Sequence, residues 1–369
     1  MSPRVAIVGP VYPYRAGIAY CTTRLAEELR KSFEVEVVSF SRQFPKRFYP
    51  GGDDVDPTLP RADAHFTLDV LNPFSWMATA LAMRRGNYDA VIFVWWIWVW
   101  ALPYRVMMAL LRRSTRVVLQ CHNIGDKEPA WWKRALTNRV LRRADALVVH
   151  AQSEADEAWR RSKGVRTVKT FLPVHELGGA IPSRADARRA LGIDAKNVAL
   201  FFGHVRPFKA LDVALRAWGE IESDALLLVA GEAWFDSEEK YRELAKSLGL
   251  TRGVRFDFRF IPDAEIATYF AACDVVLAPY RIEAQSGVAL TAFHFARPVI
   301  ASTVGGLPEI VEQGRNGMLI PTDDPLALAR AIDAFFAIDD RASFEQQAAE
   351  SARRYSWEEY GRVFTRLLN

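Results

Sequence analysis

The chain has 369 residues, of which half are hydrophobic and a quarter are charged. This is the composition of a globular protein that is too long for one ordinary core, so we expect two domains. The formal net charge of +4 conceals an asymmetry: residues 1–175 hold 26 Lys and Arg against 16 Asp and Glu, which leaves 22 against 28 for the remainder. A basic first half suits nucleic acid, an anionic membrane surface or a phosphate-bearing substrate, although a solvated surface with uneven charge gives the same count.

The three cysteines lie far apart and none belongs to a Cys-x-x-Cys pair, which argues against a zinc ribbon or a redox pair. We expect Cys21, Cys121 and Cys273 to be buried free thiols in a reducing cytoplasm. No basic and then apolar leader precedes the apolar run at 5–9. We therefore interpret that run as a first strand and expect a cytoplasmic protein.

Short apolar runs alternate with amphipathic segments along the whole chain. This alternation predicts parallel sheets with helices on both faces, and it occurs in both halves, so the fold class predicted is α/β with two doubly wound, Rossmann-like domains. Pro, Gly and polar residues accumulate at 172–189, where we place the join. The predicted strands lie at 5–9, 34–40, 89–96, 116–122, 146–150, 167–171, 197–205, 225–232, 254–260, 274–280, 298–302 and 317–321, with helical patterns at 20–32, 208–221, 238–249 and 325–337.

Residues 90–111 form the one stretch that could pass for a membrane-spanning helix, which needs about 20 apolar residues. Its first half is β-branched and aromatic, and Pro103 and Arg105 interrupt it. We therefore predict a buried strand at 89–96, a loop, and a separate helix at 101–113.

Polar residues follow several predicted strands, and in open α/β sheets ligands bind beyond the carboxyl ends of the strands. Gly17 precedes a helix after the first strand, where backbone can approach a phosphate. His122 follows the strand at 116–122 and is either a structural histidine or a general base or donor. Arg206 and Lys209 follow the strand at 197–205 and suit a diphosphate, unless they are solvated loop cations.

A further anion site is predicted where a helix begins after the strand at 274–280. The free N–H groups of Ser286, Gly287 and Val288 invite a phosphate. Glu283 would be repelled from that subsite, so it should face a sugar hydroxyl, or else only cap the helix.

Other nucleotide and metal motifs are weak or absent. The chain has neither a Gly-x-Gly-x-x-Gly fingerprint nor a Walker lysine loop. Asp54 and Asp56 have the spacing of a metal-binding carboxylate pair, but one short pair far from any strand end is a weak signal. We expect no metal and no other cofactor.

In order along the chain, the motifs Arg-Ala-Gly-Ile-Ala, Cys-His-Asn, Gly-His-Val-Arg-Pro-Phe-Lys, Glu-Ala-Gln-Ser-Gly-Val and Val-Gly-Gly-Leu-Pro-Glu resemble those of the retaining, nucleotide-sugar-dependent glycosyltransferases of family 4. The resemblance covers essentially the whole chain and implies the GT-B fold, whose two Rossmann-like domains face each other across a cleft. It implies an acceptor domain at 1–175 and a donor domain at 190–353, with the closing helix 354–369 packing back on the first domain.

The same resemblance implies roles for the residues at the strand ends. Arg206 and Lys209 would hold the donor diphosphate as it leaves, and the backbone at Ser286, Gly287 and Val288 would cradle it. The remaining implied contacts are His122 and Glu283 with the donor sugar, Gly17 in a loop over the phosphates, Glu232 near the donor pocket, and Arg259 and Ile261 beside the base. Thr291 stands where the family has a second Glu that binds ribose, so a weaker ribose contact is expected.

The implied reaction is metal-independent transfer of a hexose, from a donor such as a GDP- or UDP-hexose, with retention of configuration. Tyr14, Trp131 and Trp132 look exposed, and Trp131 opens a basic amphipathic stretch that suits an anionic membrane surface. We therefore predict a glycan or lipid-linked acceptor in cell-surface polysaccharide or glycolipid synthesis, a peripheral location on the inner face of the plasma membrane, and no nucleic-acid partner. The alternatives are internally packed tryptophans, a transferase or epimerase acting on a small soluble substrate, and a silent nucleotide-sugar-binding protein.

Overall fold

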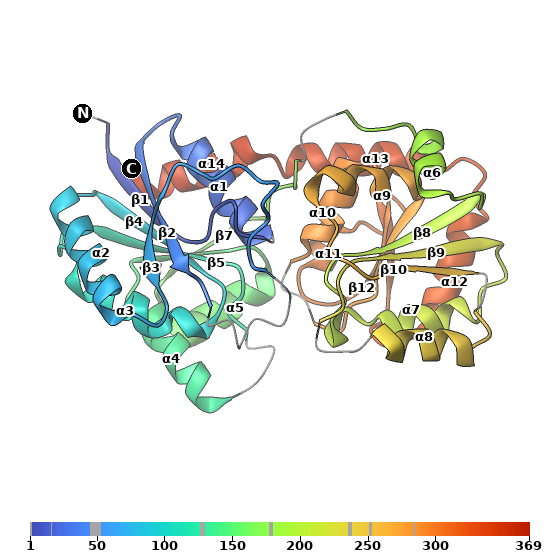
Figure 1. Ribbon diagram of the computed structural model, residues 1–369, viewed down its shortest axis with the longest axis horizontal. Coiled ribbons are helices and arrows are strands. Elements are labelled where there is room, and N and C mark those ends of the chain that lie inside the picture. The colour runs from blue at the N-terminus through green and yellow to red at the C-terminus, as the bar shows by residue number, and fades with distance from the viewer. Residues whose placement is uncertain are drawn as a thin grey trace. The chain divides into compact units, whose positions relative to one another are not determined.

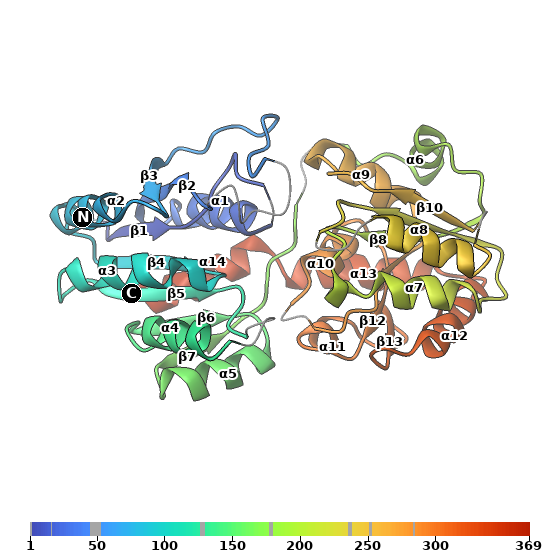
Figure 2. The same cartoon turned by 60° about the horizontal axis from the view of Figure 1, so that its bottom comes forward.

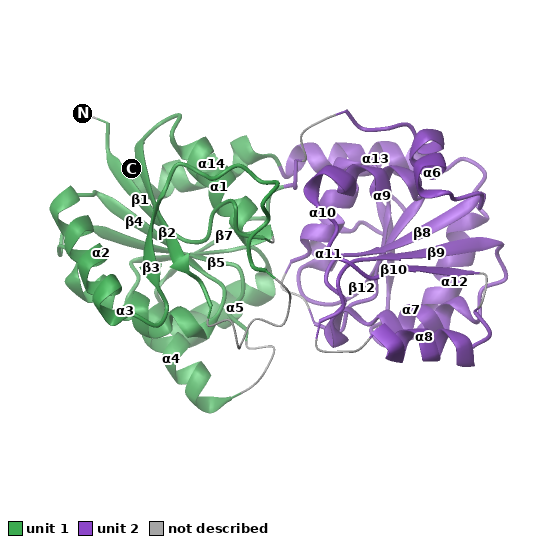
Figure 3. Cartoon of the chain, viewed as in Figure 1, with its two compact units in different colours: residues 1–173, 356–369 green, residues 174–355 purple. Residues whose placement is uncertain are grey.

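The computed structural model describes residues 2–15, 17–44, 53–125, 130–176, 180–234, 238–250, 253–282 and 285–369 (Figure 1). They form two compact units, the first made of residues 1–173 with 356–369 and the second of residues 174–355 (Figure 3). Each unit is a parallel sheet with helices on both faces. The predicted α/β class with two doubly wound domains is confirmed.

The first unit contains a seven-stranded sheet in the order β3-β2-β1-β4-β5-β6-β7, in which every neighbouring pair is parallel. Figures 1 and 2 show α1 and α14 on one face and α2 to α5 on the other. Its elements are β1 (Arg4–Val8), α1 (Gly17–Leu29), β2 (Glu34–Arg42), β3 (His65–Asp69), α2 (Pro73–Gly86), β4 (Ala90–Trp95), η2 (Trp98–Trp100), α3 (Ala101–Leu110), β5 (Arg116–Cys121), α4 (Trp131–Leu141), β6 (Ala146–Val149), α5 (Gln152–Ser162), β7 (Arg166–Lys169) and α14 (Trp357–Leu368).

The central strand β4 shows why both faces are covered. All six of its residues are buried. Because successive side chains of a strand point to opposite faces, Phe93 and Trp95 join the core beneath α2 to α5, whereas Ile92 and Val94 join the core beneath α1 and α14. A strand that is apolar on both sides belongs in the middle of a parallel sheet.

The segment 90–111 divides as the sequence predicts, into β4, the short turn η2 and α3. Within the described ranges, no helix is both long and apolar enough to cross a membrane. The prediction of buried free thiols is also confirmed for Cys21, Cys121 and Cys273. Burial raises the pKa of the Cys21 thiol to about 12, so this thiol is unreactive at neutral pH.

The second unit contains a six-stranded parallel sheet in the order β10-β9-β8-β11-β12-β13. Figure 1 shows α7, α8 and α12 on one face and α6, α9, α10 and α13 on the other. Its elements are α6 (Arg184–Leu191), β8 (Asn197–Phe202), η3 (Pro207–Lys209), α7 (Leu211–Trp218), β9 (Ala225–Ala230), α8 (Glu238–Ser247), β10 (Val254–Asp257), α9 (Asp263–Ala272), β11 (Val275–Ala278), α10 (Gly287–His294), β12 (Val299–Ser302), α11 (Leu307–Ile310), β13 (Gly317–Ile320), α12 (Pro325–Phe336) and α13 (Ala342–Arg354).

Two glycines let the ends of β8 and β9 approach each other closely. Gly231 has φ of 141°, and a Cβ atom on it would lie 2.1 Å from the carbonyl oxygen of Gly203. No side chain fits in that space or favours that backbone conformation. Gly203, with φ of 94°, in turn lies beside Val288, the second residue of α10. The ends of β8 and β9 and the start of α10 therefore lie close together.

Candidate active site

The strand order of the second unit reverses between β8 and β11, which are neighbours in the sheet although the chain visits β9 and β10 between them. At such a switch point the connections leave in opposite directions, and ligands of doubly wound sheets bind just beyond the carboxyl ends of the strands. The segment 203–209 follows β8 and the segment 279–286 follows β11. Several of the sequence-predicted donor residues belong to these two segments.

The predicted diphosphate cations follow β8 and rest on aromatic rings. The Arg206 guanidinium carbon lies 4.4 Å from the centre of the Trp234 ring. The Lys209 Nζ lies 3.7 Å from the centre of the Tyr280 ring. A ring attracts a cation without adding negative charge. The two cations can therefore be held near an anion site by groups that do not repel the anion.

The predicted anion cradle is the first turn of α10. Ser286 is the N-cap, and its side chain accepts a hydrogen bond from the Ala289 N–H at 3.3 Å. The N–H groups of Gly287 and Val288 lie in the first turn, where they have no intrahelical partner. They and the helix dipole favour an anion. The predicted helix start at 286–288 is confirmed.

Thr291, the residue at the family's second Glu position, is buried in the same helix, with an exposed fraction of 5%. Its hydroxyl donates a hydrogen bond to the Gly287 carbonyl at 2.8 Å. That proton is thus used within α10, so the Thr291 side chain keeps only its hydroxyl oxygen as a hydrogen-bond acceptor. Glu283, the predicted sugar contact, lies outside the described residues.

Three more predicted donor residues lie in the segments that follow β9 and β10. The Glu232 carboxylate accepts a hydrogen bond from the Trp234 indole at 2.8 Å. Arg259 forms ion pairs with Asp257 and Glu265, and the hydrogen bond with Glu265 is the first cause that raises its pKa. Ile261 is buried.

In the first unit, Gly17 is the first residue of α1, and nothing lies within 4 Å of the Cβ that another residue would carry there. His122 follows β5, and its backbone is fixed on both sides. The His122 N–H donates to the Trp95 carbonyl at 2.8 Å, and the Ile124 N–H donates to the Glu154 carboxylate at 2.6 Å.

The environment of the His122 ring favours its neutral form. Although the residue as a whole is half-buried, its Nε2 is shielded from solvent and has no hydrogen-bond partner among the described residues. Burial lowers the pKa of His122 to about 4. A neutral imidazole both donates and accepts hydrogen bonds, which suits the recognition of hydroxyl groups.

Sequence reasoning missed the histidine beside it. His150 follows β6, its ring centre lies 5.1 Å from that of His122, and burial holds its pKa well below the usual range. The Tyr360 hydroxyl of α14 lies 2.8 Å from His150 Nε2 and accepts a hydrogen bond from the Gln120 amide at 2.8 Å. The signal available was a second histidine at a strand end, but its partner lies 210 residues further along the chain.

The three predicted acceptor or membrane residues differ in exposure. Trp131 is 83% exposed at the start of α4, and Trp132 is 40% exposed and packs edge-on against Trp98. The expectation that Tyr14 is exposed is wrong. Its ring is buried against Phe40, and its hydroxyl donates to the Phe40 carbonyl at 2.8 Å, which satisfies the one polar atom of the side chain.

In the pair Asp54 and Asp56, the Asp56 carboxylate has a local structural role. Asp56 Oδ1 accepts hydrogen bonds from the backbone N–H and the hydroxyl of Thr58, at 2.8 and 2.6 Å. Among the residues that the structure describes, no group of three or more His, Cys, Asp or Glu side chains could hold a metal ion.

Two family models match the chain, one after the other. Residues 15–169 match the family described as Glycosyltransferase Family 4, and residues 196–337 match the family described as Glycosyl transferases group 1. The D-inositol 3-phosphate glycosyltransferase of Saccharomonospora viridis is 32% identical over 323 residues, which make up 81% of this chain and 72% of that protein.

Solved structures share the fold over nearly the whole chain. A sucrose-phosphate synthase from Thermosynechococcus elongatus has a TM-score of 0.75 and 20% identity, with 99% of this chain and 98% of that one covered. The Anabaena protein HepE, crystallised with UDP and glucose, has a TM-score of 0.77 and 17% identity, with 99% of both chains covered. The chain belongs to glycosyltransferase family 4 and is a glycosyltransferase with the GT-B fold.

Proposed function

We propose that this glycosyltransferase moves a hexose from a nucleoside-diphosphate sugar to a hydroxyl group of a glycan or a lipid-linked sugar, with retention of configuration and without a metal ion. The observation that carries the proposal is the grouping at the switch point of the second unit. Arg206 and Lys209 follow β8, and the α10 N-terminus begins beside Gly203, which directly follows that strand. Two cations and a helix N-terminus form a site for a doubly charged leaving group.

In this proposal the second unit binds the donor. Lys209 and Arg206 bind the diphosphate oxygens, and the N–H groups of Gly287 and Val288 bind the phosphate nearer to α10. The solved structures of the Anabaena protein with UDP and with UDP-glucose support a donor of this class. Because the Thr291 hydroxyl proton is used inside α10, we expect the ribose to be held more weakly than by a carboxylate at this position.

The first unit supplies the neutral His122 to the donor sugar. With a pKa near 4, this imidazole carries no charge at neutral pH, so it can position a sugar hydroxyl without repelling a positively charged transition state. Gly17, where an added Cβ atom would have no neighbour within 4 Å, leaves room for the phosphates at the start of α1.

The reaction then needs no metal to stabilise the leaving group. The bond between the anomeric carbon and the phosphate oxygen breaks, and Arg206 and Lys209 stabilise the charge that develops on the diphosphate. The acceptor oxygen forms its bond to the anomeric carbon on the same face, and the acceptor proton passes to the departing phosphate oxygen. These cations do the work that a divalent ion does in metal-dependent transferases.

A membrane-bound acceptor is supported by the surface of the first unit. Trp131, which is 83% exposed, is followed in α4 by Trp132, Lys133 and Arg134. Exposed aromatic and basic side chains together favour the headgroup region of an anionic membrane. These observations support our proposal that the protein acts at the inner face of the plasma membrane, in the synthesis of cell-surface polysaccharide or glycolipid.

A small soluble acceptor is the second candidate. The names of the relatives favour it, since D-inositol 3-phosphate glycosyltransferases and a sucrose-phosphate synthase are among them. Incubation with UDP- and GDP-hexoses and either inositol 3-phosphate or a membrane extract separates the two. Labelled sugar in the lipid phase supports the first candidate, and label only on the soluble phosphate supports the second. No transfer and no donor hydrolysis, despite nucleotide binding, would contradict both and favour a silent binding protein.

A further inference from the structure

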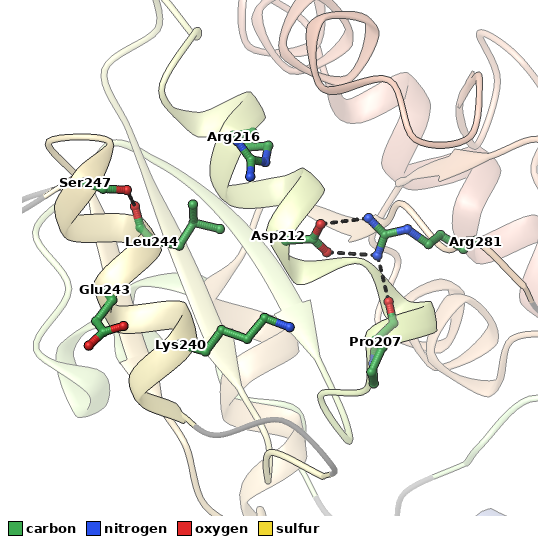
Figure 4. A pocket seen from close by; sticks show the side chains of 8 residues that line it. All are labelled: Pro207, Asp212, Arg216, Lys240, Glu243, Leu244, Ser247 and Arg281. Atoms are coloured by element: carbon green, nitrogen blue, oxygen red, sulfur yellow. Dashed lines mark hydrogen bonds and ion pairs between the residues drawn. The ribbon is translucent and has the colours of Figure 1, made fainter.

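Arg281 anchors the loop that carries Arg206 and Lys209. The backbone N–H of Arg281 donates to the Phe208 carbonyl at 2.8 Å. Its guanidinium Nη1 donates to the Pro207 carbonyl, also at 2.8 Å (Figure 4). Arg281 therefore binds two consecutive carbonyl groups of the loop, one through the main chain and one through the side chain.

The Arg281 side chain is itself fixed by two carboxylates. Its two terminal nitrogens donate to Asp212, in the first turn of α7, at 2.9 and 2.7 Å. Its Nε donates to Asp323 at 2.5 Å. Figure 4 shows the bidentate pair and the bond to Pro207 on one side of a pocket between α7 and α8. A planar fork bound in this way has little freedom to move, and lysine cannot reproduce it.

The end of the Lys209 side chain lies over the ring of Tyr280. The ring is 1% exposed, and the Tyr280 carbonyl accepts a hydrogen bond from the buried Ser302 hydroxyl. The Lys209 ammonium lies 3.7 Å from the ring centre. The Tyr280 hydroxyl is buried and has no hydrogen-bond partner within the described part of the chain. The ring, rather than the hydroxyl, is thus the part of Tyr280 that acts on Lys209.

We propose that Tyr280 and Arg281 are positioning residues for the transfer reaction: Arg281 fixes the backbone of the loop 206–209, and Tyr280 fixes the Lys209 ammonium at the diphosphate site. The proposal rests on the proposed role of Lys209. It gives Tyr280 and Arg281, which lie in the connection after β11, a function through the loop 206–209 rather than through direct contact with the substrate.

The first test is a double-mutant cycle on nucleotide binding, with UDP and GDP as probes and the folded state of each variant checked by thermal unfolding without nucleotide. Tyr280→Leu should raise the Kd of the tighter-binding nucleotide by about tenfold, since a desolvated cation–π contact is lost. Tyr280→Phe should stay within about twofold of the native protein, because it keeps the ring. In the Lys209→Ala background, Tyr280→Leu should add less than about twofold.

A merely structural role predicts a different cycle, in which the losses from Lys209→Ala and Tyr280→Leu multiply. Multiplying losses, or a Tyr280→Phe variant as weak as Tyr280→Leu, would overturn the assignment of the ring to Lys209. If Lys209→Ala itself left binding and transfer unchanged, the proposed function would fail. If Lys209→Ala were impaired but Tyr280→Leu behaved as native, only the positioning role would fail.

The second test uses Arg281→Lys, which keeps the charge and the main-chain bond but loses the fork. We expect kcat to fall more than the donor KM rises, because the loop cations act mainly on charge that develops in the transition state. Arg216→Gln is the matched control. Arg216 lines the same pocket and has no side-chain hydrogen bond or ion pair to a described residue. Equal effects of the two substitutions would contradict the anchoring role of Arg281.

Discussion

Replacing Tyr360 by Phe should destabilise the first unit by about 2–6 kcal/mol. Tyr360 is 0% exposed, and the change removes its hydroxyl while the ring keeps its packing against Trp357 and Phe364. Two contacts of 2.8 Å are lost, and the nitrogens of Gln120 and His150 that made them remain buried without that partner. Each buried polar group left unpaired costs about 1–3 kcal/mol.

Urea denaturation followed by tryptophan fluorescence measures this loss. Nine of the 11 tryptophans lie in the first unit, so its unfolding dominates the signal. Thr365→Val in the same helix is the control, because the Thr365 hydroxyl donates only to the Gly361 carbonyl one turn earlier. We expect the control to change the free energy of unfolding by less than about 1 kcal/mol. A Tyr360→Phe change as small as that of the control would refute the reasoning.

Three further predictions concern stability, pH and membrane contact. Gly231→Ala should lower the free energy of unfolding by about 3 kcal/mol or more, because its Cβ atom would lie 2.1 Å from the Gly203 carbonyl oxygen. Thermal unfolding should show a much smaller effect for Gly249→Ala, since Gly249 also has a positive φ but lies in open space. Similar losses for the two variants would argue against the close approach. His122 has a pKa near 4 when folded and about 6.5 when unfolded, so the unfolded chain binds more protons and stability should fall as pH drops from about 6.5 to about 4; an unchanged pH slope in His122→Gln would contradict this. Trp131→Ala should weaken flotation with anionic vesicles while Leu326→Ala, an exposed apolar residue of the second unit, should not; absence of native binding rules out the membrane contact.

The sequence predicts the sheets well where strands are buried on both faces. The runs around β4 and β8 are continuously apolar, as is typical of strands in the middle of a parallel sheet. It misses β3 (His65–Asp69), because this edge strand is short and mostly polar, and only Leu68 of its residues is fully buried. An edge strand pairs with a neighbouring strand along only one edge and is less buried than a central strand. Its sequence therefore need not be continuously apolar.

The candidate site is predictable where it follows from local pattern. Arg206 and Lys209 follow a strand and Ser286 begins a helix, and these positions are visible in the sequence. The partners that hold them are not visible, because they come from distant segments: Arg281 reaches back 74 residues to Pro207. Tyr14 shows the same limit, since it lies between β1 and α1 and its burial depends on Phe40, which lies in β2.

The central claim is that Lys209, in the segment that follows β8, stabilises a departing nucleoside diphosphate. The most direct measurement is the steady-state rate of hexose transfer or donor hydrolysis, with UDP- and GDP-hexoses in the presence of EDTA, for the native protein, Lys209→Ala and Lys246→Ala. Lys246 is an exposed lysine of α8 and serves as the control. The account predicts activity in EDTA, a fall in kcat of about 10²–10³-fold for Lys209→Ala and a native rate for Lys246→Ala. A Lys209→Ala variant that transfers sugar at the native rate would contradict it.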